Sequence, residues 1–137
     1  MKSKHLLRIV GIALLVGLVL SSCIIVVTPK VSISDRLNSF ASHLTDASRS
    51  SVYTDFYPNT PGYNAGASPV VWSVFTAGVY TVTIIDSSNP AAVTAIIYGG
   101  GTFATGRNAT FSMLTNGSGD YMIYSVSVTS GGISFTI

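Results

Sequence analysis

The side chains best able to carry acid–base chemistry in this sequence are those of His43 and Asp55. Asp55 stands between two phenols, Tyr53 and Tyr57, and burial beside them would tune its carboxyl for proton transfer. A general base must also lie within about 3 Å of the proton that it removes. The plainer interpretations are a solvated or packed helix histidine and an exposed loop carboxylate. We therefore name no catalytic residue and keep an enzyme only as the alternative function.

The same aromatic segment could instead help to bind a ligand. Trp72 follows it along the chain, and Arg107 could hold an anion or form a weak salt bridge with Asp86 at one end of a sheet. The candidate ligand-binding residues are Tyr53, Asp55, Tyr57, Trp72 and Arg107. The chain has no Glu, and its His, Cys and Asp residues do not show metal-ligand spacing. We expect no metal site and no cofactor.

The single cysteine of the chain, Cys23, directly follows a segment with the parts of a secretory signal. Basic residues lie within positions 2–8, and positions 9–20 form an apolar run. This run is short for a membrane span, which needs ~20 apolar residues. Residues 23–27 lengthen it, so an uncleaved helical anchor is an alternative, and ordinary secretion is another.

Leu20-Ser21-Ser22-Cys23 resembles the lipobox of bacterial lipoproteins. The resemblance implies that residues 1–22 are a signal peptide, that the Cys23 sulfur carries a diacylglycerol, and that the new amino terminus carries a further acyl chain such as palmitate. Two or three acyl chains would hold the protein on membrane lipid. Ile24 stands where an aspartate would retain a lipoprotein in the inner membrane. The implied location is therefore the bacterial cell envelope, at the outer membrane where the source has one.

The charge of the chain changes if the signal is removed. The full sequence has seven Lys and Arg against five Asp, and three of the basic residues lie in the signal. The remaining four basic and five acidic residues leave a net charge of −1. Without a basic patch that neutralises several phosphates, nucleic acid is not an expected partner.

The rest of the chain predicts a tether over residues 23–32 and one α+β domain over residues 33–137. Ser34 is the expected N-cap of a helix, whose apolar positions recur at helical spacing. The predicted apolar stripe is Ile33, Leu37, Phe40, Leu44 and Ala47. From residue 79 the hydrophobic period changes to two, which predicts four antiparallel strands over residues 79–86, 92–98, 101–115 and 121–128. The segment 133–137 could extend the last strand.

Strand alternation also predicts a register. Ile84 should face Val93, and Met113 should face Met122, with all four side chains on the inner face that the helix covers. An all-β sandwich is the competing fold, but it would leave the helical stripe unexplained.

A leading amphipathic helix followed by a four-stranded meander resembles the nuclear transport factor 2-like (NTF2-like) and cystatin-like superfamilies, over roughly residues 33–128. The aromatic segment 52–58, Trp72 and the meander carry the resemblance. It implies a curved sheet wrapped around a helix, often with a pocket between them. It also implies the alternative function, an isomerase or dehydratase that uses such a pocket.

The other face of the predicted sheet carries apolar residues as well. The residues expected there are Ile85, Ile96, Leu114, Tyr121 and Ile123. A sheet that is apolar on both faces needs a second covering layer. That layer could be the C-terminal segment, the chain around Trp72, a second copy of the chain or another envelope protein. This pattern favours a non-enzymatic interaction module, either a homodimer or one part of an envelope complex.

Overall fold

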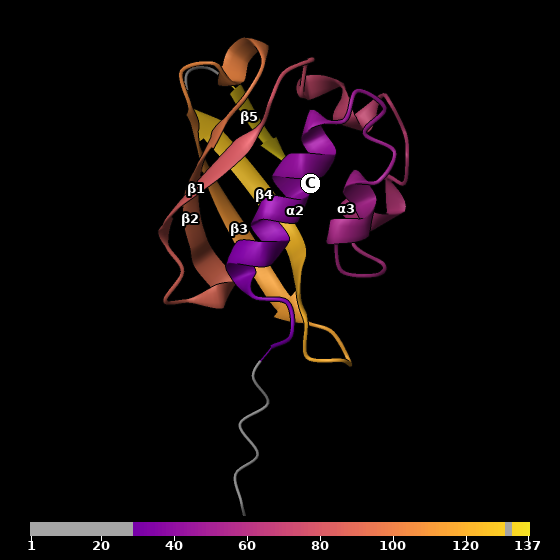
Figure 1. Ribbon diagram of the computed structural model, residues 1–137, viewed down its shortest axis with the longest axis vertical. Helices are drawn as coiled ribbons and strands as arrows, with labels where there is room; N and C mark the ends of the chain where they lie inside the picture. Colours follow the sequence, from indigo (N-terminus) through magenta and orange to yellow (C-terminus); the bar gives the residue numbers. More distant parts are fainter. Residues whose placement is uncertain (1–28, 131–132) are drawn as a thin grey trace, which may run out of the picture.

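A long amphipathic helix and an antiparallel sheet make up most of the computed structural model, which describes residues 29–130 and 133–137 (Figure 1). The helices are α2 (Ile33–Thr45) and the short α3 (Pro61–Asn64). The 3₁₀ turns are η1 (Val52–Asp55), η2 (Val71–Val74), η3 (Pro90–Ala92) and η4 (Gly101–Phe103). The strands are β1 (Thr81–Asp86), β2 (Val93–Tyr98), β3 (Arg107–Thr115), β4 (Tyr121–Ser130) and β5 (Ile133–Thr136).

The predicted α+β class, with the helix against an antiparallel meander, is confirmed. The strands follow one another in the order β1-β2-β3-β4-β5, and α2 and the segment after it lie on one side of the sheet (Figure 1). β5 adds a fifth strand by pairing with β4, where Val128 is opposite Phe135. The C-terminal segment therefore extends the edge of the sheet and does not cover its outer face.

Helix α2 begins two residues earlier than predicted, because Ser32 rather than Ser34 is the N-cap. The Ser32 hydroxyl accepts a hydrogen bond from the Asp35 backbone N–H, and the Asp35 carboxylate accepts one from the Ser32 N–H. This reciprocal pair is a capping box. The Ser32 hydroxyl also donates to the Asp35 carboxylate, and these hydrogen bonds lower the pKa of Asp35.

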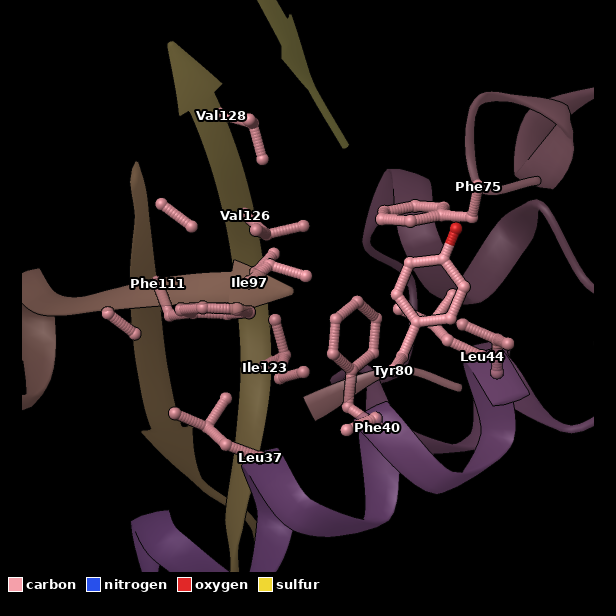
Figure 2. Packing of buried hydrophobic residues seen from close by; sticks show 14 of the residues in the cluster. Leu37, Phe40, Leu44, Phe75, Tyr80, Ile97, Phe111, Ile123, Val126 and Val128 are labelled. Atoms are coloured by element: carbon pink, nitrogen blue, oxygen red, sulfur yellow. The ribbon is translucent and has the colours of Figure 1, made fainter. Parts of the chain in front are cut away.

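The apolar stripe of α2 packs against the sheet. Leu37, Phe40 and Leu44 are fully buried, whereas Ala47 lies beyond the end of the helix and is exposed. The Phe40 ring makes edge-to-face contacts at 5.8–6.2 Å centroid distance with three other rings, those of Phe56, Phe75 and Phe111. In Figure 2, Leu37 and Phe40 point from α2 toward the strands. Aromatic side chains from α2, β3 and the segment between α2 and β1 therefore pack together between the helix and the sheet.

The β1–β2 register is shifted by two residues from the predicted one. Ile84 faces Ala95 rather than Val93, and Val82 faces Ile97. Because side chains alternate with a period of two, a two-residue shift leaves the same residues on the inner face. The predicted pairing was wrong, but the predicted face was right.

The β3–β4 register contains a bulge that the strand pattern did not predict. Ser112 is opposite Ser125 and Met113 is opposite Ile123, so Tyr124 is an extra residue in β4. A single extra residue reverses the alternation on one side of the bulge. The predicted pairing of Met113 with Met122 is therefore wrong, and the β4 residues before the bulge lie on the opposite face from the one expected.

Candidate functional site

The polar cluster of greatest chemical interest surrounds the buried carboxylate of Asp55. Asp55 is the last residue of η1, and its side chain is 0% exposed. Its Oδ1 accepts hydrogen bonds from Arg36 Nη1 at 3.1 Å and from the Ser39 hydroxyl at 2.7 Å. Its Oδ2 lies 2.7 Å from His43 Nδ1. We call these four residues, Arg36, Ser39, His43 and Asp55, the Asp55 cluster.

The three partners of Asp55 all come from one face of α2. Arg36, Ser39 and His43 are spaced by three and four residues, and side chains at this spacing lie above one another on a helix. Arg36 also donates from Nε to the Tyr121 carbonyl at 2.8 Å. The cluster therefore links α2 to η1 and to the start of β4. A carboxylate with this many donors, one of them cationic, can be buried without an unpaired charge.

The cluster orients the imidazole of His43. Because a carboxylate accepts hydrogen bonds, Asp55 Oδ2 holds the proton of His43 on Nδ1 and leaves Nε2 for another partner. The His43 side chain is 32% exposed, so solvent reaches part of the ring. An aspartate orients the base of a serine hydrolase in the same way. Here, however, the Ser39 hydroxyl is directed at Asp55 and not at Nε2, so the cluster contains an oriented base without an aligned nucleophile.

The candidate ligand-binding residues do not form one group. Trp72 is buried, with its ring 5.7 Å from Phe56 and its Nε1 donating to the Gly66 carbonyl. Tyr53 is half-buried and packs edge-to-face on Tyr63, and Tyr57 is half-buried. Trp72 is therefore a core residue, and the carboxylate of Asp55 is already hydrogen-bonded to side chains of α2.

Arg107 lies apart from both Asp55 and Asp86. It begins β3 opposite Ile97, which in turn faces Val82, whereas Asp86 faces Thr94 nearer the other end of β1 and β2. Arg107 Nε donates to the Thr102 carbonyl at 2.6 Å. Among the described residues, the Arg36–Asp55 ion pair and the His43–Asp55 contact both involve Asp55, and neither includes Arg107. The predicted Asp86–Arg107 salt bridge is wrong, and an anion site at Arg107 stays a prediction.

The outer face of the sheet is only partly as predicted. Ile85 and Leu114 are exposed, at 62% and 43%, and Ile96 is half-buried. Tyr121 and Ile123 are instead on the inner face, where Ile123 is 0% exposed and Tyr121 packs against the core. The bulge after Ile123 causes this reversal. Two tyrosines that the prediction omitted, Tyr98 and Tyr124, are exposed on the outer face.

Sequence reasoning also missed Arg36 and Ser39. Their spacing from His43 was a usable signal, because it places three polar side chains on one line beside the apolar stripe. Three aligned polar side chains predict a polar partner on a neighbouring element, although their spacing does not identify Asp55 as that partner.

Cys23 and the signal segment lie outside the described residues. Within residues 29–130 and 133–137, no helix is long and apolar enough to cross a membrane. In the same part of the chain, no three His, Cys, Asp or Glu side chains are grouped in a way that could hold a metal ion.

The comparisons with known proteins identify no relative. No family model matches the sequence, and neither a curated protein nor a solved structure matches it significantly.

Proposed function

We propose that this chain is a lipid-anchored protein of a bacterial cell envelope whose domain binds another protein and catalyses no reaction. The lipobox-like segment ending at Cys23 supports the anchor, and Ile24 supports the outer membrane in a source that has one. The partner is a second copy of the chain or another envelope protein.

One observation carries the interaction part of this proposal. No described segment covers the outer face of the sheet, although four large apolar or aromatic side chains on it are exposed. They are Ile85, Tyr98, Leu114 and Tyr124. Meanwhile the space between the inner face and α2 is filled with aliphatic and aromatic side chains. A protein with a filled interior and several exposed apolar and aromatic side chains on an uncovered sheet face is better suited to binding a partner than to enclosing a substrate.

The anchor is tested by replacing Cys23 with serine. The variant should lose metabolic labelling with fatty acid and should accumulate as an uncut or mislocalised precursor, because serine cannot form the thioether. A variant that is still labelled and cut would exclude the lipoprotein proposal. Membrane attachment without labelling would instead support the uncleaved helical anchor.

The outer face is tested by Leu114→Lys, with Thr110→Lys as the matched control. Both residues are exposed on the outer face of β3, but only Leu114 is apolar. Leu114→Lys should reduce dimer formation or partner capture by at least tenfold, which is ~1.4 kcal/mol, while its Tm stays close to that of the control. Equal association of wild type and both variants would exclude this face as the binding surface.

The second candidate function is an NTF2-like isomerase or dehydratase, and the pairing of His43 with Asp55 is the observation that favours it. A test is His43→Gln, whose amide can still donate to Asp55 but cannot transfer a proton. If the cluster is structural, this variant keeps its stability and its partner capture. Loss of a proton-transfer activity with unchanged stability would favour the enzyme. The NTF2-like or cystatin-like relationship itself is supported by the order of elements, a helix and then a meander.

A further inference from the structure

The chain enters the domain at a fixed point beside the start of β4. The Val31 backbone N–H donates to Asp120 Oδ1 at 3.2 Å, and its carbonyl accepts from the Tyr121 N–H at 3.1 Å. Arg36, in the first turns of α2, donates to the carbonyl of the same Tyr121. These bonds hold the segment around Val31 against β4. The tether therefore joins the domain at this one point.

The entry point lies at the same end of the domain as the β3–β4 turn, residues 116–119 (Figure 1). The side chain of Asn116 organises this turn, because its Oδ1 accepts from the backbone N–H groups of Ser118 and Asp120, both at 2.9 Å. The Asn116 N–H also donates to the Asp120 carbonyl. We call this turn together with Val31 the proximal end.

The opposite end of β3 carries a second well-defined loop. β3 is nine residues long and begins at Arg107, so its ends are separated by ~27 Å at about 3.4 Å per step. Arg107 Nε is bonded to the Thr102 carbonyl in the loop that precedes it. We call the loop of residues 101–106 the distal end.

The length of chain before the entry point limits how the domain can stand on a membrane. Cys23 precedes Val31 by eight residues, which reach at most ~28 Å when fully extended. With the domain inverted, the distal end would lie ~27 Å below Val31, so the segment would have to be almost fully extended to keep this end out of the lipid. Any bend in the segment would push the distal end into the lipid in the inverted arrangement.

We propose that a lipid surface is the neighbour of the proximal end, and that the distal end is presented away from the membrane. This inference rests on the lipid anchor of the proposed function. Charge does not direct it, because the carboxylates of Asp35 and Asp120 near the entry point are balanced by Lys30 and Arg36. The short tether and its point of entry set the orientation, and the outer sheet face stays lateral, where a membrane-bound partner can reach it.

Two labelling positions test the orientation in the full acylated protein. Cys23 is the only cysteine, and its sulfur is blocked once it is acylated, so an introduced thiol takes the label alone. Gly117→Cys marks the proximal end, where an added Cβ meets no atom within 4 Å. Ala104→Cys is the matched distal position, because Ala104 is also exposed in a turn. Energy transfer to a headgroup dye in vesicles of neutral phosphatidylcholine then reports the height of each label.

The proximal label should lie nearer the lipid by up to ~27 Å, and the difference should not change with ionic strength. Inserting about twenty Gly and Ser residues after Thr28 should remove the difference, because a long flexible linker allows all orientations. Equal or reversed heights in the vesicle-bound protein, or a difference abolished by salt, would overturn the orientation alone. A protein that does not bind vesicles would overturn both the anchor and the orientation.

Discussion

The two faces of the sheet differ in composition and in exposure. On the inner face, the side chains of β2 and β3 alternate into the core, and Ala95, Ile97 and Phe111 are at most 1% exposed. On the outer face, the alternate positions are mainly Thr and Ser, with single apolar residues such as Leu114 among them. The inner face is continuous and closed by α2, whereas the outer apolar residues are exposed.

This difference separates stability from association. Free energy of unfolding should depend on the inner face, because removing buried apolar area from water is the main favourable contribution to folding. Substitutions on the outer face should change contacts with a partner while the fold persists. Matched substitutions on the two faces can therefore test both assignments at once.

The largest effect is expected from Ile123→Lys, compared with Leu114→Lys. Ile123 is 0% exposed, so an ammonium there would be buried without a partner, and the domain should lose more than about 4 kcal/mol of stability. Leu114 is 43% exposed, and its change should stay within about 0.5 kcal/mol. Urea unfolding followed by circular dichroism measures both. If both variants were equally stable, the bulge at Tyr124 would be misplaced.

The next effect concerns the buried charge on the inner side. Asp55→Ala should destabilise the domain by about 3–5 kcal/mol, because it leaves the guanidinium of Arg36 without its carboxylate. Asp46→Ala is the control, since this carboxylate is exposed and only caps the loop after α2. Thermal and urea unfolding should rank Asp55→Ala far below the control. Similar stabilities would mean that water already screens the Asp55 cluster.

The elements of the inner face could be predicted from local pattern. The stripe of Leu37, Phe40 and Leu44 has helical spacing, and the strands before the last hairpin alternate regularly. The bulge in β4 could not be predicted in this way. Met122 and Ile123 are equally apolar, so the sequence permits either on the inner face, and only packing against α2 and η1 selects Ile123. Local alternation fails wherever one extra residue is tolerated.

The Asp55 cluster was harder to predict, because its partners lie on separate elements. The spacing of apolar residues on α2 identifies only the side chains that face the core. It therefore assigns Arg36 and Ser39 to the exposed side of the helix. The burial of Asp55 follows from the path of the chain after α2, which periodicity does not describe. Asp55 therefore appeared as a loop carboxylate, although its side chain is among the most buried in the described domain.

A smaller effect is expected at His43, which the sequence analysis interprets as a solvated or packed helix histidine. His43→Ala removes one hydrogen bond to a buried charge, but its ring is one-third exposed, so a loss of about 1–2 kcal/mol is expected. A double-mutant cycle with Asp55→Ala should give a coupling energy of at least about 0.5 kcal/mol. Strictly additive losses in the two variants would show that the 2.7 Å contact contributes nothing to stability.

The smallest effect on stability is expected at Ile85, which lies at the edge of the outer face. Its side chain is 62% exposed at the irregularity between the Ile84–Ala95 and Asp86–Thr94 pairs. Ile85→Lys should therefore change the free energy of unfolding by no more than about 0.5 kcal/mol. Its effect on association shows how far the binding surface extends from Leu114 on β3 toward β1. Sedimentation or partner capture by Ile85→Lys, compared with Thr83→Lys on the same strand, measures that extent. A loss as large as that of Leu114→Lys would place β1 inside the interface. Unchanged association would confine the interface to the side of the sheet formed by β3 and β4, where Tyr124 is also exposed.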